Sequence, residues 1–276
     1  MTHRFDPGYV CEPFVSLCET YPGPDVYPPD DFRVEWGPIF HRGRLDGTAR
    51  VLVIGQDPGQ HENMTRRILV GEAGQRVQGF LRKLGITESH VMLNAYLYSV
   101  YGLGGSSHLD DPPIVDYRNR WLNALLVGTG VEAVVAFGRY AEDAFGRWKD
   151  TELGQQRDVA FRHVSHPTYP ESAAASGSKT RAEAMAEMLP SWNEAVEALR
   201  PAVLHPDVEP DLTPYGTDLT EADRAPIPDR DLPPGVPVWM RSLEAWALRR
   251  GDTADEKRAT IVVTVPSVHR TWTPIE

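Results

Sequence analysis

Cysteine is scarce in this sequence. Its 276 residues include two cysteines, Cys11 and Cys18, which are too few for a four-thiolate zinc or iron–sulfur site. We therefore expect no metal site, no metal cluster and no bound cofactor. In a reducing cytosol the two thiols are expected to stay free rather than to form a bridge.

Long apolar runs are also missing. No stretch approaches the ~20 apolar residues that a membrane-spanning helix needs. The start of the chain, Met1–Pro7, lacks the apolar middle region of a secretory signal. We therefore expect a soluble, cytoplasmic protein without a membrane partner, and we expect it to be a monomer.

Positive charge is in deficit, with 28 Lys and Arg against 39 Asp and Glu and a net charge of -11. Because binding to polyanions draws its affinity from Lys and Arg that displace counterions, this balance argues against indiscriminate binding of nucleic acid. The charges are unevenly spread, however, and acids gather between Asp207 and Asp231. A basic span holds Arg66, Arg67, Arg76, Arg82 and Lys83. This asymmetry permits a basic face on an acidic protein, and the alternative is ordinary solvated helix charges.

The apolar content, 41% of residues, is enough to bury one substantial core. Four apolar runs indicate strands, at Arg50–Ile54, His90–Leu93, Glu132–Phe137 and Val159–Val164. Helical patterns cover Ala73–Leu84, Ile114–Leu126, Arg139–Trp148 and Lys179–Leu199. Because strands alternate with helices, the sequence predicts an α/β fold: a central, mainly parallel four-stranded sheet flanked by helices.

The composition also predicts three regions along the chain. Residues 1–45, rich in Pro and Gly, are expected to form a lead-in that packs on the α/β core at 46–200. Residues 201–276 are expected to form a Pro- and Asp-rich extension with a short helix over Val238–Arg250 and a strand over Thr260–Val265. The small residues of Ser172–Ser178 pack little, so we expect this segment to be mobile until a partner binds.

Two polar turns carry the candidate chemistry. The apolar run that starts at Val51 stops on Gly55-Gln-Asp-Pro-Gly59, and the run that ends at Val164 is followed by His166-Pro-Thr-Tyr-Pro170. An open α/β sheet binds ligands beyond the carboxyl ends of its strands. A carboxylate and an imidazole at two such ends would make an acid/base or electrostatic pair if the fold brings them together.

These blocks, with others, resemble the uracil-DNA glycosylase superfamily. Gly55–Gly59 is similar to its water-activating loop, and His166–Pro170 to the loop that joins the catalytic imidazole with the DNA wedge. His90–Asn94 is similar to the strand that ends in a base-reading amide. Leu69–Gln75 resembles the segment that opens the next helix, and Ala136–Ala141 a later strand-to-helix junction. The order and spacing of the blocks are more specific than any single one.

The resemblance implies the role of each site residue. Breaking a deoxyribose–pyrimidine bond builds positive charge on the sugar and negative charge on the departing base. Asp57 would position the attacking water and stabilise the cationic sugar, and His166 would donate a hydrogen bond to the pyrimidine O2, in either charge state. Asn94 would read the edge of the extruded base. Gln56, Gly59 and Leu69 are the other expected base contacts.

Two of these positions depart from the family pattern. Gly59 stands where uracil-specific members place a bulky Tyr that blocks C5 substituents, although an iron–sulfur branch also carries glycine there and still resembles uracil enzymes. Leu69 stands where that iron–sulfur branch usually has a Phe that stacks on the base, and the loss of this ring could cost ~1–3 kcal/mol of stacking unless another ring or an enlarged ligand compensates. Both departures favour a roomier pocket that is less tailored to uracil.

DNA contacts are expected outside the pocket. Tyr169 is the candidate wedge that fills the space left by the flipped nucleotide, because the apolar Leu expected after the His-Pro pair is absent. The cations expected to hold flanking phosphates are Arg66, Arg67, Lys179 and Arg181.

The sequence thus predicts a monofunctional DNA glycosylase acting on single- or double-stranded DNA. Uracil is the family default, and a C5-modified base such as hydroxymethylated or glucosylated cytosine is the competitor, in DNA repair or anti-phage defence. The acidity motivates an alternative, a non-catalytic DNA-binding or DNA-mimicking module of the same fold. A nucleotide-binding Rossmann-like enzyme ranks last, because Gly55 begins neither Gly-x-Gly-x-x-Gly nor a Gly-Lys-Ser/Thr loop.

Overall fold

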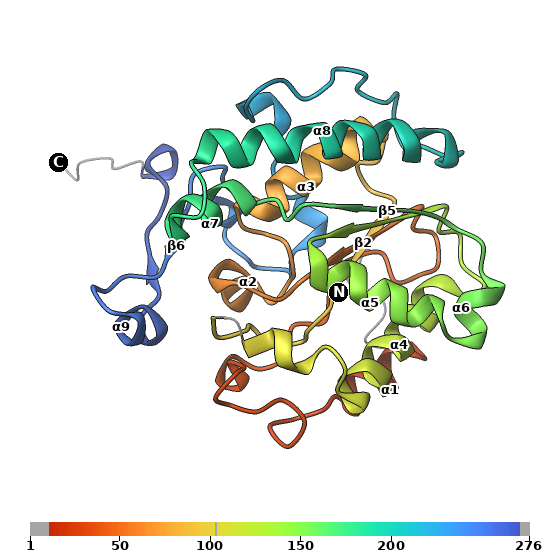
Figure 1. Ribbon diagram of the computed structural model, residues 1–276, viewed down its shortest axis with the longest axis horizontal. Helices are drawn as coiled ribbons and strands as arrows, with labels where there is room; N and C mark the ends of the chain where they lie inside the picture. The colour runs from red at the N-terminus through yellow and green to blue at the C-terminus, as the bar shows by residue number, and fades with distance from the viewer. Residues whose placement is uncertain (1–10, 103, 271–276) are drawn as a thin grey trace.

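The centre of the protein is a five-stranded sheet (Figure 1). The computed structural model describes residues 11–102 and 104–270. The strands, in the order β1-β3-β2-β4-β5, are β1 (His41–Gly43), β3 (His90–Asn94), β2 (Val51–Gly55), β4 (Ala133–Phe137) and β5 (Ala160–Val164). β2, β3, β4 and β5 run parallel, which confirms the predicted mainly parallel α/β sheet. β1 is an antiparallel edge strand. It was not predicted, because three residues are too few to show an apolar periodicity.

Helices cover both faces of the sheet. The longer ones are α3 (Glu72–Lys83), α4 (Pro112–Leu126), α5 (Arg139–Lys149) and α8 (Arg181–Leu199), which confirm the four predicted helices to within a residue or two at each end. Helices of eight residues or fewer were not predicted: α1 (Phe14–Glu19), α2 (Gln60–Thr65), α6 (Glu152–Gln156), α7 (Tyr169–Ser176) and α9 (Ala254–Ala259). α3 and α8 lie on one face, and α1, α4 and α5 on the other (Figure 1).

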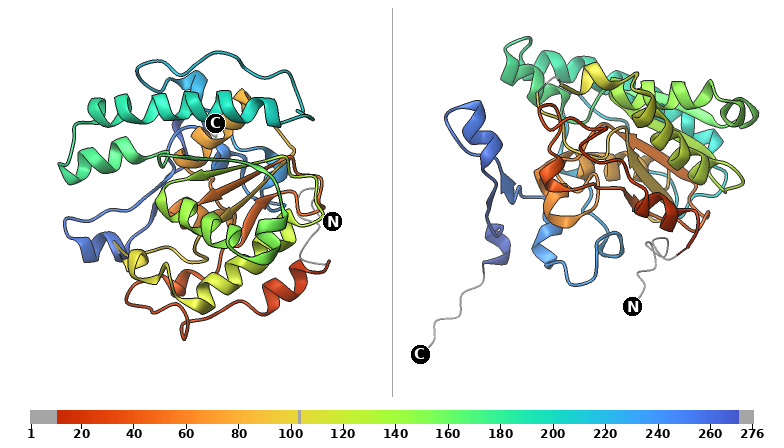
Figure 2. Two further views of the ribbon diagram at one scale, coloured as in Figure 1. Left: turned by 45° about the vertical axis from the view of Figure 1, so that its right-hand side comes forward. Right: turned by 90° about the horizontal axis from the view of Figure 1, so that it is seen from below.

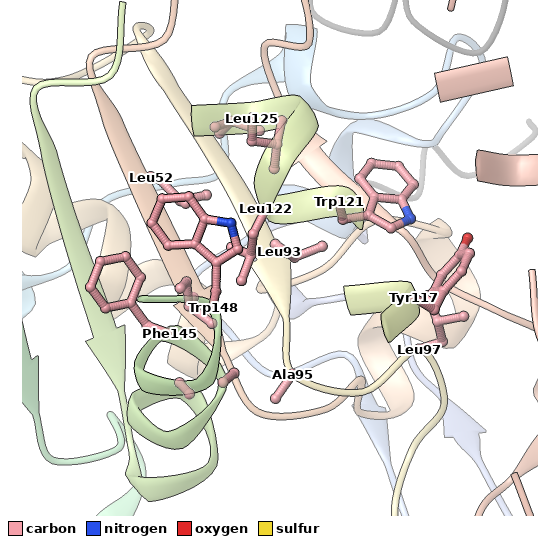
Figure 3. Packing of buried hydrophobic residues seen from close by; sticks show 14 of the residues in the cluster. Leu52, Leu93, Ala95, Leu97, Tyr117, Trp121, Leu122, Leu125, Phe145 and Trp148 are labelled. Carbon is pink, nitrogen blue, oxygen red and sulfur yellow. The ribbon is translucent and has the colours of Figure 1, made fainter. Parts of the chain in front are cut away.

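Alternation along the strands divides the core into two layers. Leu52 of β2 belongs to the layer that holds Trp121 and Trp148, where the indole rings pack over the sheet (Figure 3). Val53, the next residue, belongs to the opposite layer with Trp192 of α8. A strand that is covered on both faces needs apolar side chains at every position. The uninterrupted apolar run Val51–Ile54, all of it buried, therefore suits β2 to the centre of the sheet.

The chain beyond α8 wraps around the core through polar contacts. The carboxylate of Asp207 accepts three backbone hydrogen bonds from residues 87–89, at 2.7–2.9 Å. Farther along, buried Asp231 accepts from Arg42 of β1 at 2.8 Å and contacts His90 of β3 at 2.9 Å. Farther along the chain, the backbone of Ala247 is hydrogen-bonded to Gln60 and His61 of α2, at 3.4 and 3.3 Å. Residues 1–10 of the expected lead-in and 271–276 of the expected extension lie outside the described residues.

The predicted helix at Val238–Arg250 is wrong. A short 3-10 turn covers Val238–Arg241, and the chain then extends into β6 (Ala247–Leu248), which pairs with β7 (Val262–Val263). The physical reason is tertiary, because Trp246 is buried and the backbone beside it bonds to strand and core partners rather than to its own helix. The predicted strand at Thr260–Val265 is confirmed as β7, which is shorter. Figure 2 shows the chain around α9 standing away from the α/β core.

Three further observations concern the segment after His166, membrane-spanning helices and metal sites. Residues 172–176 form the C-terminal part of α7, which ends at Gly177 in a left-handed conformation. The mobility expected of residues 172–178 stays a prediction. Among the described residues, no helix is both long and apolar enough to cross a bilayer. In the same residues, no cluster of three or more His, Cys, Asp or Glu is arranged to hold a metal ion.

Candidate functional site

A cavity of about 410 Å³ opens beyond the carboxyl ends of β2 and β5. Its walls come from the loop after β2, from α2, from the start of α3, from the loop after β5 and from the end of β6. Asp57 and His166 line this one cavity, although they lie 109 positions apart in the sequence. The fold therefore brings the predicted carboxylate and imidazole together at the strand ends, where α/β sheets bind ligands.

Asp57 is fixed and electrostatically perturbed. Its Oδ2 accepts a hydrogen bond from the backbone N–H of Val100 at 3.0 Å. Burial raises the pKa of Asp57 from 3.8 to about 6, against the opposing effects of the Val100 hydrogen bond and of nearby Arg249. The carboxylate is therefore an anion at neutral pH and a stronger base than an ordinary aspartate.

His166 is a neutral hydrogen-bond donor. Its Nδ1 accepts a hydrogen bond from the backbone N–H of Thr168 at 3.3 Å, and the Thr168 hydroxyl lies 3.1 Å from the same atom. Burial, with a smaller effect from the positive charge of Arg76, lowers the pKa of His166 to about 4. A neutral ring whose Nδ1 accepts carries its proton on Nε2. The charge state left open by the sequence is therefore neutral, with Nε2–H as the donor.

Arg76 holds the His166 loop from behind. Its guanidinium is buried, donates to the carbonyl oxygen of Pro167 at 2.5 Å and forks onto Glu171 at 2.9 and 3.0 Å. It also pairs with Glu72. A bidentate arginine fixes geometry as well as charge. The sequence placed Arg76 in a basic span, and this span does not form a basic face, because Arg67, Arg76 and Lys83 are all buried.

Glu62 organises the wall beside Gly59. Its carboxylate accepts hydrogen bonds from the backbone N–H groups of Gly59, Val70 and Gly71, at 3.0, 2.9 and 3.3 Å. A Cβ at position 59 would lie 2.9 Å from Oε2 of Glu62. The space beside Gly59 is therefore bordered by a carboxylate. Glu62 stands three residues after Gly59, the N-cap of α2, and a carboxylate at this position reaches back to the N-cap backbone N–H. This spacing is the sequence signal from which Glu62 could have been predicted.

Leu69 and Asn94 both lie against Gly55. Leu69 lines the cavity and has a φ of 52°, a left-handed conformation that is rare for a leucine. Asn94, at the end of β3, is buried and does not line this cavity; a Cβ on Gly55 would lie 2.4 Å from its Oδ1. That Oδ1 has no hydrogen-bond partner among the described residues. The structure thus places Asn94 beside Gly55 and not on the cavity wall, and its role in reading a base stays a prediction.

Gln56 and Tyr169 border a second hollow beside His166. This groove, of about 350 Å³, shares Gln56, His166 and Ser172 with the main cavity. Tyr169 begins α7, and its hydroxyl donates to Glu187 of α8 at 3.0 Å. The predicted wedge therefore packs beside the site, and its insertion into DNA stays a prediction.

The cations predicted to hold phosphates have protein partners. Arg66 donates to the carbonyl oxygens of Trp36 and Pro38, both at 2.7 Å, and buried Arg67 donates to the carbonyl oxygen of Arg66 at 2.9 Å. Lys179 pairs with Glu187, and Arg181 pairs with Glu171 and Asp218. The structure does not bring these four residues to the cavity.

The C-terminal segment supplies a cavity wall that the sequence did not predict. Ala245, Leu248 and Arg249 line the cavity. The segment is held by Trp246, whose ring packs edge-on against His61 at 4.7 Å, and by the N–H of Ala247, which donates to Nε2 of His61 at 3.3 Å. The sequence offers only one signal for this docking, a tryptophan within the short apolar run Ala245–Leu248 of the Pro- and Asp-rich extension.

The comparisons with known proteins agree with this geometry. The family model described as the uracil DNA glycosylase superfamily matches residues 42–192, more than half of the chain. No curated protein matches the chain. The matched region holds β2 to β5, the last two residues of β1 and both strand-end loops of the cavity. The chain therefore belongs to the uracil DNA glycosylase superfamily, whose members act on DNA as base-excising hydrolases.

Proposed function

We propose that this protein is a monofunctional DNA glycosylase that hydrolyses the N-glycosidic bond of a flipped, modified pyrimidine and leaves an abasic site. The observation that carries the proposal is the pairing of an anionic Asp57 with a neutral, Nε2-protonated His166 on one cavity. Charges of opposite sign develop on the two sides of the scissile bond, and these two groups match them.

Each residue has a distinct task in this mechanism. The Asp57 carboxylate orients a water for attack at the anomeric carbon and stabilises the positive charge on the sugar. The His166 Nε2–H donates to the pyrimidine O2 as negative charge builds on the departing base. The proposal is limited to base release because strand cleavage by a lyase step needs an amine nucleophile. No lysine is among the described residues that line the cavity.

The wall beside Gly59 supports a base with a polar C5 substituent. Glu62 uses its oxygens for three backbone N–H groups, and a carboxylate has about four lone-pair sites. A hydroxyl on a C5 substituent would find an acceptor there, whereas a methyl group would lie against a charge without compensation. We therefore favour uracil or a hydroxyl-bearing base, such as hydroxymethylated or glucosylated cytosine, over thymine. A defence role against phage DNA that carries such bases, in the cytoplasm, follows as part of the proposal.

The test is a panel of single strands and duplexes that carry uracil, thymine, 5-hydroxymethylcytosine or glucosylated cytosine, scored for alkali-labile sites. Release of the hydroxyl-bearing bases supports the defence role, and release of uracil alone supports repair. Asp57→Asn and His166→Ala should lose turnover and keep most of the affinity for DNA. Binding without any base release by the wild type would favour the non-catalytic DNA-binding module.

A further inference from the structure

The cavity is acidic, and one cation stands in its wall. Three carboxylates line it, those of Asp57, Glu62 and Glu72, and among the described lining residues Arg249 is the sole Lys or Arg. A polyanion approaching this opening meets repulsion from the carboxylates, so a local cation has a large effect on binding. Arg249 lies outside residues 42–192, the part of the chain that matches the family model.

The backbone around Arg249 is held in place before any ligand arrives. β6 pairs with β7, and the N–H of Thr264 donates to the carbonyl oxygen of Trp246 at 2.8 Å. On the core side, Ala247 donates to His61, and Gln75 donates to the carbonyl oxygen of Ser242 at 2.8 Å. Arg249 directly follows Ala247 and Leu248, which these contacts anchor. Its backbone is therefore already ordered, and binding a ligand costs little further conformational entropy there.

Arg249 lines the cavity, and its guanidinium is supported by an aromatic ring. It lies 5.3 Å from the ring centre of Trp36, and Arg33 lies 4.6 Å from the same ring centre. The Nε atom of Arg249 is buried and has no hydrogen-bond partner among the described residues. Stacking on an indole leaves the N–H groups at the edge of the guanidinium open to an anion.

We propose that Arg249 binds a DNA phosphodiester group next to the flipped nucleotide, so that the C-terminal segment 242–249 forms part of the DNA site. This inference rests on the proposed function. A flipped nucleotide carries its flanking phosphates to the mouth of the pocket, and a guanidinium fork matches phosphate oxygens. It supplies the cation that Arg66, Arg67, Lys179 and Arg181, each bonded within the protein, do not bring to this cavity.

The experiment measures binding of full-length protein to DNA with a tetrahydrofuran abasic analogue, which does not depend on the identity of the base. Each phosphate flanking the analogue is replaced in turn by a neutral methylphosphonate. Arg249→Gln should weaken binding about tenfold, as for one charge-assisted contact, and lower the slope of log K against log salt by about one. At one of these phosphates, the methylphosphonate should weaken DNA binding by the wild type and leave DNA binding by Arg249→Gln unchanged.

Controls separate this role from folding and from catalysis. Arg249→Lys keeps the charge without the fork and should bind between wild type and Arg249→Gln; Arg250→Gln, an exposed neighbour, should bind as the wild type does. Thermal unfolding checks that each variant is folded. The inference would be overturned if both Arg249 variants bound DNA with the affinity of the wild type. It would also be overturned if, at every phosphate position, the losses of affinity caused by Arg249→Gln and by the methylphosphonate simply added. Base release by the wild type, measured separately, decides the proposed function.

Discussion

Oε2 of Glu62 lies 3.0 Å from the backbone nitrogen of Gly59 and would lie 2.9 Å from a Cβ at that position. The glycine leaves room for the carboxylate, and the carboxylate in turn shapes the wall of the pocket. A larger residue at position 59 must displace a group that is held by two further backbone N–H groups. Gly59 therefore has a role in local packing, in addition to the space for a base that the proposed function assigns to it.

Gly59→Tyr should select against C5-substituted bases. The ring would project toward the cavity, and the displaced Glu62 would no longer offer its acceptor to a substituent. We expect kcat/KM for hydroxymethylated cytosine to fall at least about tenfold more than that for uracil. The base panel measures the ratio. Gly146→Ala is the control, since a Cβ there meets nothing within 4 Å, and it should change neither value. An equal fall for all bases would contradict selection at this wall.

The pH profile should follow Asp57 alone between pH 5 and 8. The pKa of Asp57 is raised to about 6, so kcat/KM should rise with pH through about 6 and then level as the carboxylate ionises. His166, with its pKa lowered to about 4, stays neutral across this range and adds no second limb. Arg249→Gln should move the rise to higher pH, because Arg249 attracts the anionic form of Asp57 and Glu62 opposes it. A rise centred near 4 would contradict this assignment.

Asp57→Asn should stabilise the fold at neutral pH while it abolishes turnover. A folded-state pKa raised from 3.8 to about 6 contributes stability that is complete below pH 3.8 and lost as the pH rises through about 6. At pH 7.5 the ionised group therefore destabilises the wild type, by up to on the order of 3 kcal/mol. Asparagine keeps an acceptor for Val100 without the charge.

Urea denaturation of the variant and the wild type at pH 4 and pH 7.5 measures the effect. The gain should appear at pH 7.5 and nearly vanish at pH 4. Asp116→Asn, at an exposed position on α4, is the matched control and should show a small difference at both pH values. A loss of stability at both pH values would show that the Asp57 charge is not under strain in the native state.

The sequence predicted the central sheet and the two strand-end loops because strong apolar runs stop on polar turns. Asp57 and His166 follow such runs, and parallel strands bring their carboxyl ends to one edge. The sequence did not predict the contribution of Arg249, because Trp246 docks on His61 through contacts between residues 185 positions apart. The side-chain partners of Arg66 and Lys179 were equally hidden, since charge counts do not show which cations are already paired. The positions of β2 and α3 could be predicted from local patterns, whereas the cavity wall formed by the C-terminal segment depends on tertiary contacts.

Arg76→Lys should lower kcat with a small change in KM. Lysine keeps a positive charge near His166, but it cannot donate to Pro167 and fork onto Glu171 at once. The His166 loop would then shift, and a displacement of about 1 Å in a catalytic group lowers the rate about a hundredfold. Steady-state base release at varied substrate concentration measures kcat and KM, and single-turnover base release measures the chemical step alone. Arg147→Lys breaks a similar fork onto Asp143, at 2.7 and 3.2 Å, away from the cavity, and should leave kcat unchanged. Equal rates for Arg76→Lys and the wild type would show that the loop holds His166 without this arginine.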